Sequence, residues 1–278
     1  MVQHRVTVCL LALVLVSGCA TRDSFPAPRA EAQAPAVAVA SDPRRSYLPP
    51  EQLARLGAET PQAPAPGSAG EAADRAYSER LTGWADTPRW TLAQTHAEVS
   101  PALALAHFDC PLGTRLSQEP PPALVRLFTR ALRDASIAST AAKNRAFRAR
   151  PFADDPSRAT CIRTDESLRG SASHPSGHAT VGALYGMIMG DVAPDVAEEM
   201  YRRGREIGFS RAVCGLHYPA DVDAGQALGY EIYRALMDLP EYQADLAEAR
   251  REVAEARTKA LRNPGCAAER AALAQELS

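Results

Sequence analysis

Apolar residues recur along most of this chain at the three- and four-residue spacing of amphipathic helices. The clearest case follows Pro121 and Pro122, either of which suits the first position of a helix. Beyond them, one apolar stripe is formed by Leu124, Leu127, Phe128, Ala131, Leu132 and Ala135. The sequence lacks the alternation of β-branched and polar residues that is typical of strands. The pattern therefore predicts an all-α fold with a single helical domain.

The same periodicity predicts further helices on both sides of this stripe. They are expected over residues 74–82, 91–108, 178–189, 194–207, 221–237 and 241–261. Ser68 or Gly70 is in position to cap a helix that begins near Glu71. Gly208 is expected to end the fourth of these helices, because glycine commonly follows the last helical residue.

The first apolar run, Val6–Val16, is typical of a targeting segment. It follows a weakly positive start and is too short for a comfortable membrane span. Its end, Val16-Ser17-Gly18-Cys19, resembles a bacterial lipobox, in which Cys19 is lipidated after cleavage. Several acyl chains would anchor the protein stably, and Ala20 favours the outer membrane. We expect a lipoprotein on the periplasmic side of the envelope; an ordinary secretory signal cut near Ala20 is the alternative.

Composition divides the chain into four parts. We expect a lipoprotein signal peptide over 1–18, a disordered tether rich in Ala and Pro over 19–45, the folded domain over 46–262 and a tail over 263–278. After the signal, no apolar run has the length of a membrane span, so membrane contact is expected through the anchor only. A formal net charge of −2 provides no general field for binding nucleic acid.

Four of the six cysteines are candidates for disulfides. Cys9 lies in the signal and Cys19 is the proposed lipid site, which leaves Cys110, Cys161, Cys214 and Cys266. An even set in an oxidising compartment predicts bridges, and four cysteines allow three pairings between which the sequence alone does not choose. A zinc site is disfavoured, because no two of these cysteines are close in sequence. We expect no metal and no cofactor.

Three short segments carry the candidate chemistry: Lys143–Pro151, Pro175–His178 and Ser210–Asp221. They contain two histidines, a Ser-Gly turn and three cations, which are Lys143, Arg150 and Arg211. A phosphoryl group in transfer needs cations and N–H donors around its oxygens, a nucleophile on one side and an acid on the other. The three segments together can supply that set.

His217 and Asp221 are four residues apart, so they share a face if both lie on the first turn of a helix. The carboxylate would then accept from Nδ1–H and leave Nε2 as a nucleophile. Ser176 and Gly177 form a turn that can aim N–H groups at an anion, at the start of a helix where His178 is placed to protonate a leaving oxygen. Taken singly, a surface ion pair and a plain helix cap are the competing interpretations.

The cations near these segments divide into two groups. Arg150 and Arg211 can hold phosphate oxygens bidentately, and Lys143 can act as a point charge. Lys143 and Arg150 share one face if their segment is helical, and Pro151 is expected to end that helix. The other arginines are expected to be solvated at the surface, namely Arg145, Arg148, Arg202, Arg203 and Arg205.

The order and spacing of the three segments resemble the signature of the type 2 phosphatidic acid phosphatase superfamily. That signature is Lys, six residues, Arg-Pro; then Pro-Ser-Gly-His; then Ser-Arg, five residues, His, three residues, Asp, and every defining position is filled here. Within the superfamily the chain is most similar to the bacterial class A non-specific acid phosphatases, from about Tyr47 to about Ala254. It departs from them at His174, where they usually carry an aromatic rim residue, and at Ala179, where they carry Thr.

The resemblance implies a metal-independent, all-α acid phosphatase that acts on small phosphorylated substrates. His217 would attack phosphorus and become phosphohistidine, Asp221 would orient it, and His178 would protonate the leaving alcohol and then activate water. The phosphate oxygens would be held by Lys143, Arg150, Ser176, Gly177 and Arg211. Such a site predicts a bell-shaped pH profile on the acidic side of neutrality.

Several alternatives remain open at this stage. A vanadium-dependent haloperoxidase has a similar site, and that family often reads Pro-Ser-Gly-His-Ala, as this chain does. A phosphatase for lipid phosphates or pyrophosphates, a catalytically idle lipoprotein and a homo-oligomer are also compatible with the sequence. If the motif segments converge, they bring Cys161 near Cys214, which favours the pairing Cys161–Cys214 with Cys110–Cys266.

Overall fold

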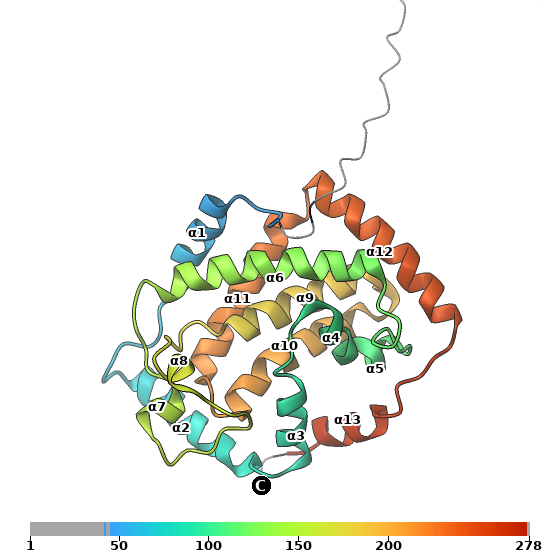
Figure 1. The fold of residues 1–278 in the computed structure, drawn as a ribbon. Coiled ribbons are helices and arrows are strands. Elements are labelled where there is room, and N and C mark those ends of the chain that lie inside the picture. The colour runs from blue at the N-terminus through green and yellow to red at the C-terminus, as the bar shows by residue number, and fades with distance from the viewer. Residues whose placement is uncertain (1–41, 43–44, 277–278) are drawn as a thin grey trace, which may run out of the picture. The chain divides into compact units, whose positions relative to one another are not determined.

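The structure of the protein is a computed structural model that describes residues 42 and 45–276. These residues fold into helices joined by loops, and no strand occurs among them, so the predicted all-α class is confirmed (Figure 1). The proposed signal peptide, Cys19 and most of the proposed tether lie outside the described residues. Within the described part, no helix combines the length and the apolar character that a membrane span requires.

Three long helices form the centre of the fold. Helix α9 (Gly177–Val192) packs against α10 (Ala197–Val213) and α11 (Pro219–Leu236) (Figure 1). Glycines allow the close approach of α9 and α10, because a Cβ at Gly182 would lie 2.7 Å from the carbonyl oxygen of Gly204. Nearly every residue of α9 is buried, as expected of a helix that is apolar on all sides.

Helix α6 (Pro122–Lys143) covers this centre with the apolar stripe read from the sequence. Pro122 occupies its first helical position, as predicted. The stripe is buried except at Leu132, which is half-buried. Two further helices, α1 (Pro50–Glu59) and α12 (Pro240–Thr258), pack against α6. The helix predicted from the long amphipathic pattern, α6, thus forms the layer that packs on α9.

Short elements complete the fold. Ser68 caps α2, because its side chain accepts from the backbone N–H of Glu71 at 3.1 Å. The remaining elements are α2 (Ala69–Arg80), η1 (Leu81–Trp84), α3 (Pro88–Thr95), α4 (Pro101–Ala104), η2 (Leu105–Phe108), α5 (Asp109–Leu112), α7 (Pro151–Asp154), α8 (Glu166–Arg169), η3 (Pro194–Val196) and α13 (Cys266–Leu273).

Two predicted helices have the wrong limits. The single helix expected over 91–108 is broken, because Pro101 has no N–H and starts a new helix, α4. Helix α10 does not end at Gly208 but continues to Val213. Gly208 is needed there for packing, since a Cβ on it would lie 3.0 Å from the Cβ of Ala179 on α9.

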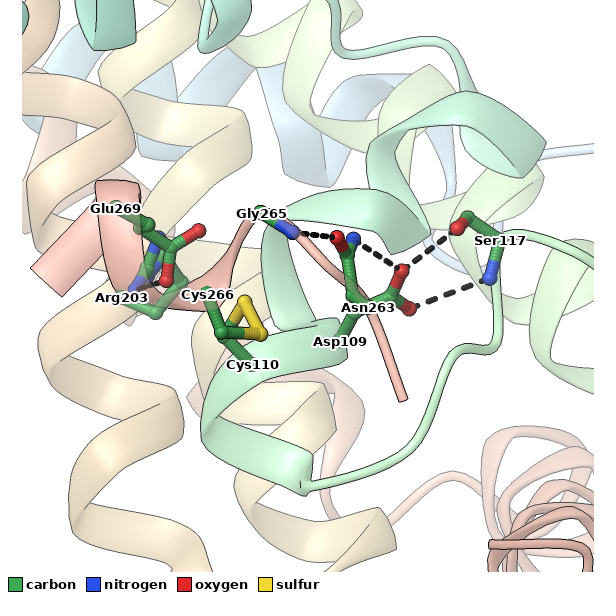
Figure 2. Close-up of a disulfide and its surroundings, with 8 residues drawn as sticks. All are labelled: Asp109, Cys110, Ser117, Arg203, Asn263, Gly265, Cys266 and Glu269. Carbon is green, nitrogen blue, oxygen red and sulfur yellow. Dashed lines mark hydrogen bonds and ion pairs between the residues drawn. A yellow bond between two sulfur atoms is a disulfide. The ribbon is translucent and has the colours of Figure 1, made fainter. Parts of the chain in front are cut away.

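The two disulfides have the predicted pairing, Cys161–Cys214 and Cys110–Cys266. The second joins α5 to α13 (Figure 2). Helix α13 also packs against α3. Beside it, Asp109 accepts hydrogen bonds from Ser117 and Asn263. Arg203 of α10 forms an ion pair with Glu269 of α13 and is 6% exposed, so the prediction that Arg203 is solvated is wrong. Its charge is neutralised inside the fold.

Candidate active site

The three motif segments meet where the first residues of α9 and α11 lie beside the ends of α6 and α10. Direct bonds join them: Arg150 contacts His217, and the backbone N–H of Ser176 donates to the carbonyl oxygen of Asp221 at 2.8 Å. The structure therefore brings the predicted site residues together. They are Lys143 at the end of α6, Arg150 before α7, Ser176, Gly177 and His178 at the start of α9, Arg211 in the last turn of α10, and His217 and Asp221 around the start of α11.

His217 presents the lone pair of Nε2 on the side of the cations. Nη1 of Arg150 lies 2.9 Å from Nε2, and a guanidinium can only donate. Nε2 is therefore the acceptor, and the proton of neutral His217 is on Nδ1. Burial lowers the pKa of His217 to about 3, and the charges of Arg150 and Lys143 act in the same direction. The imidazole is neutral above that pH, as a nucleophile requires.

The link between His217 and Asp221 contains a residue that the sequence did not indicate. Nδ1 of His217 lies 3.7 Å from Oδ2 of Asp221 and 3.3 Å from the hydroxyl of Ser173. That hydroxyl donates to the same carboxylate oxygen at 2.6 Å. His217 precedes α11, so the two residues do not share a helical face as predicted. Ser173 completes the link, because its hydroxyl oxygen accepts a hydrogen bond from Nδ1–H and its O–H donates one to Asp221.

Asp221 is fully buried and surrounded by donors. Oδ1 accepts from Arg148 at 2.7 Å and from Nδ1 of His174 at 3.1 Å, and Oδ2 accepts from the backbone N–H of Tyr218 at 2.9 Å. Burial alone raises the pKa of this carboxyl group, but the bond from His174, the nearby ring of His217 and the charge of Arg148 bring it far below its usual value. Asp221 is therefore an ionised carboxylate at every pH at which the His217 imidazole is neutral.

Arg148 was expected to be solvated, and that prediction is wrong. Its guanidinium bridges Asp221 and Asp74 of α2, each at 2.7 Å, and lies 4.2 Å from the centre of the Tyr218 ring. The sequence signal was weak, because Arg148 falls inside the six-residue spacer of the first segment and its partner Asp74 is far away in the chain. His174 was also expected elsewhere, at the rim of the site. It is 8% exposed and belongs to this buried network.

The first segment is not one helix, contrary to the prediction. Helix α6 ends at Lys143, and Pro151 starts α7 instead of ending a helix. The stretch between them is not helical, and the backbone N–H of Ser173 donates to the carbonyl oxygen of Arg148 at 2.8 Å. This non-helical stretch turns back toward the site and brings Arg150 near Lys143. The two residues do not share a helical face.

Arg150 and Arg211 are buried, Lys143 is half-buried, and none of the three cations has a carboxylate partner among the described residues. Lys143 donates to the carbonyl oxygen of Ala172 at 2.6 Å, and Arg150 donates to that of Leu216 at 3.0 Å. Arg211 is 3% exposed, and its Nε and Nη1 have no hydrogen-bond partner in the described part of the chain. Burying unpaired charges is costly. An oxyanion between them would satisfy these donors and offset that cost.

The pKa values of the cations reflect the same environment. Burial, followed by the charge of Arg150, lowers the pKa of Lys143 to about 7. Burial likewise lowers the pKa of Arg150 and of Arg211 to about 10. The arginines therefore stay charged near neutrality, whereas the charge of Lys143 depends on pH in that range.

The start of α9 adds donors from the backbone. Ser176 caps the helix by accepting from the N–H of Ala179 at 3.3 Å. The first N–H groups of a helix, here those of Gly177 and His178, have no partner inside the helix and favour an anion. Nε2 of His178 lies 3.2 Å from the carbonyl oxygen of Ala97, so Nε2 is a donor and Nδ1 is the nitrogen that can exchange a proton. Burial, Arg211 and His217 hold the pKa of His178 well below its usual value.

Comparison with known proteins agrees with this geometry. Residues 123–244 match the PAP2 superfamily. The chain is 34% identical over 169 residues to a non-specific acid phosphatase of Salmonella typhimurium. The aligned region is 60% of this chain and 67% of that protein. It is 36% identical over 172 residues to an acid phosphatase of Zymomonas mobilis, covering 62% and 65% of the two chains. A non-specific acid phosphatase of Providencia stuartii is 30% identical over 218 residues, 78% of this chain and 88% of its own.

Proposed function

The chain belongs to the PAP2 superfamily, in which it is similar to non-specific acid phosphatases, and from that premise we propose that it hydrolyses phosphate monoesters through a phosphohistidine intermediate. The observation that carries the proposal is the Nε2 lone pair of His217 beside two buried arginines and a half-buried lysine, none of which has a carboxylate partner in the described part of the chain. The site is built for an anion that accepts many hydrogen bonds and is attacked by nitrogen.

In the first step, Nε2 of His217 forms a bond to phosphorus and the bond to the leaving oxygen breaks. His178 gives the proton on Nδ1 to that oxygen, which leaves as an alcohol. The bound phosphate dianion favours the protonated form of His178 that this step needs, and thereby opposes the effect of burial and Arg211. Ser173 accepts from Nδ1–H of His217 and donates to Asp221, whose negative charge stabilises the positive charge that develops on the ring.

In the second step, His178 takes a proton from water, the oxygen of that water attacks phosphorus, and the bond from phosphorus to Nε2 breaks. Inorganic phosphate leaves and His217 is regenerated. In both steps the equatorial oxygens lie among Lys143, Arg150, Arg211 and the N–H groups at the start of α9, which stabilise the transition state. Ser176 supports that turn by capping α9, and its hydroxyl proton remains free to donate.

His217→Ala tests this proposal. We expect the variant to lose at least about 10⁴-fold in turnover of p-nitrophenyl phosphate while it keeps the helical circular dichroism of the wild type. Acid-quench trapping with labelled substrate should give an acid-labile phosphoenzyme in the wild type and none in the variant. A stable phosphoserine would contradict the mechanism. Halide oxidation with vanadate and peroxide, in place of hydrolysis, would assign the site to haloperoxidase chemistry.

His178→Ala tests the role of the proton donor. A sugar phosphate has a poor leaving group and should lose about 10²- to 10⁴-fold in rate, whereas p-nitrophenyl phosphate should lose far less, because its phenolate needs little protonation. The measurement is the ratio of kcat for the two substrates in variant and wild type. Equal losses would mean that His178 binds phosphate and does not deliver the proton.

We also propose that the enzyme acts in the bacterial envelope, on the periplasmic side. The support comes from the apolar run Val6–Val16 and the lipobox-like segment that ends in Cys19. The two disulfides of the described part suit an oxidising compartment. Metabolic labelling with a radioactive fatty acid, compared between the wild type and Cys19→Ser, tests the lipid anchor.

A further inference from the structure

His174 makes two hydrogen bonds that only a doubly protonated ring can make. Nδ1 lies 3.1 Å from Oδ1 of Asp221, and Nε2 lies 2.8 Å from the carbonyl oxygen of Pro61. A carbonyl oxygen and an ionised carboxylate are both acceptors without a proton to give. Each ring nitrogen of His174 must therefore donate. Neutral histidine has a single N–H, so the geometry requires the imidazolium.

A protonated His174 balances a row of buried charges. The row runs from Asp74 through Arg148 and Asp221 to His174, with each carboxylate bonded to Arg148 and Asp221 also bonded to His174. Two negative and two positive charges sum to zero when His174 carries its proton. Without that proton the row has a net charge of −1, on the side of His217 where Asp221 lies. A buried, unbalanced charge of this kind is costly.

Other charged groups face His174 from the neighbouring elements. Lys143, at the end of α6, donates to the carbonyl oxygen of Ser173, the residue before His174. Glu71 of α2 and Arg145 of the 144–150 stretch line the same cavity of about 210 Å³ as His174. Arg145 donates to the carbonyl oxygen of Thr60. Asp221 is the only one of the carboxylates named here that bonds to the His174 ring, so it dominates the local charge.

We propose that His174 is a positioning residue that acts as a fixed cation: it holds Asp221 in place and keeps His217 unprotonated. The inference rests on the proposed phosphatase function. His217 attacks only when Nε2 is free of a proton, and a positive charge on the far side of Asp221 disfavours a second positive charge on His217. The bond to Pro61 ties the same ring to the proline-rich segment 61–66, which fixes its orientation.

The most informative variant is His174→Tyr. A phenol offers one donor and no positive charge, so His174→Tyr can keep the bond to Asp221 or the bond to Pro61 but not the charge. His174→Phe removes both donors as well as the charge. Phe147→Ala is the matched control, since Phe147 lines the same cavity, is 68% exposed and makes no bond to Asp221.

The test is the pH dependence of kcat and kcat/KM for p-nitrophenyl phosphate in the four proteins. For His174→Tyr we expect kcat to fall roughly tenfold, with a larger fall in His174→Phe. KM should change little. In both variants the acidic limb of kcat/KM should move toward neutral pH by about one unit, because His217 then holds a proton more easily. Phe147→Ala should follow the wild type.

A second measurement does not depend on turnover. With ¹⁵N-labelled histidine, nuclear magnetic resonance should show a bonded proton on both ring nitrogens of His174 at the pH of maximal activity. A His174 nitrogen without a proton, or an acidic limb in His174→Tyr that coincides with the wild type, overturns the inference. If His174→Phe fails to fold, His174→Tyr and the wild-type spectrum still decide. A wild type that hydrolyses no phosphate ester contradicts the proposed function instead, and the spectrum still tests the charge of His174.

Discussion

Arg203 and Arg211 lie about two turns apart on the same helix, α10, and both are buried, but they end in opposite surroundings. Arg203 lies near the Cys110–Cys266 disulfide, where Glu269 of α13 pairs with its charge although its Nη1 has no partner among the described residues (Figure 2). Arg211 is at the end near His217, where no carboxylate of the described residues pairs with it and two of its nitrogens have no partner. The first arginine joins two helices, whereas the second is proposed to bind the phosphate of the substrate.

The comparison shows what distinguishes a structural buried charge from a functional one. A buried ion pair balances its desolvation cost inside the fold, and removing one partner leaves the other uncompensated. An unpaired buried cation destabilises the fold until a ligand arrives, and burial lowers the pKa of Arg211 to about 10 as a sign of that cost. Two arginines that are both buried should therefore respond to mutation in opposite ways.

The largest effect should come from replacing each of these arginines by methionine, which keeps much of the side-chain volume but no charge. Arg211→Met should lower kcat/KM about a thousandfold and leave the free energy of unfolding unchanged or slightly higher. Arg203→Met should leave kcat/KM within a few-fold and lower the free energy of unfolding by about 3 kcal/mol, because Glu269 loses its partner. Steady-state kinetics and urea denaturation measure the two quantities.

Similar stability losses in both variants would break the distinction between the two arginines. Arg130→Met is a useful addition, because Arg130 is 1% exposed and forms ion pairs with Glu241 and Asp245. It should behave like Arg203→Met, with lower stability and nearly unchanged kinetics.

The two disulfides should also differ in whether their loss affects stability alone or both stability and activity. Replacing Cys110 and Cys266 by serine should lower the free energy of unfolding by about 2–4 kcal/mol and leave kcat/KM nearly unchanged. Replacing Cys161 and Cys214 should cost a similar amount of stability and also lower kcat/KM. The reason is that Cys214 lies three residues before His217, and the backbone N–H of Cys161 donates to the carbonyl oxygen of Cys214 at 3.2 Å. Equal kinetic losses would show that α13 also supports the site.

The smallest effect concerns pH, and here activity and stability should move in opposite directions. Lys143, with a pKa of about 7, must be charged to hold phosphate, so kcat/KM should fall above about pH 7. The acidic limit comes from His217, with a pKa of about 3, so the optimum should lie on the acidic side of neutrality.

The free energy of unfolding should change with pH in the direction opposite to kcat/KM. The pKa of Lys143 is lower in the folded state than in the unfolded chain, so between about pH 7 and 9 the unfolded chain binds more protons and the free energy of unfolding should rise with pH. Lys143→Arg should move the alkaline limb of kcat/KM upward and remove the rise in stability. Urea denaturation at pH 7 and pH 9 measures the second quantity. An alkaline limb that stays in place in Lys143→Arg would assign it to another group.

Much of the site was readable from the sequence, because its defining residues lie at fixed spacings in three short segments. The residues that hold Asp221 were not, since the partners are far apart: Arg148 and Asp74 are separated by 74 positions. Ser173 and His174 border the second segment but are polar residues without a periodic pattern. Their role depends on the side chain of Asp221, which contacts them from α11.

The errors in helix limits have a similar origin. Pro101 and Pro151 each start a helix, and that much can be read from the preference of proline for the first helical position. The continuation of α10 through Gly208 cannot be read in the same way, because it depends on contact with Ala179 of α9. Local sequence favours a helix end at glycine, and the packing of α10 against α9 reverses that preference.

The position of Asp221 has a consequence for how activity appears in a newly made chain. The same carboxylate that faces His217 also accepts from the backbone N–H of Tyr218, as part of the capping box that starts α11. Its own carbonyl oxygen receives the N–H of Ser176 at the start of α9. The beginnings of two helices and the orientation of the nucleophile are thus set by one residue. Under the proposed mechanism, a chain in which α11 has not formed contains His217 without the carboxylate that orients it, so we expect activity to appear only once α11 has folded.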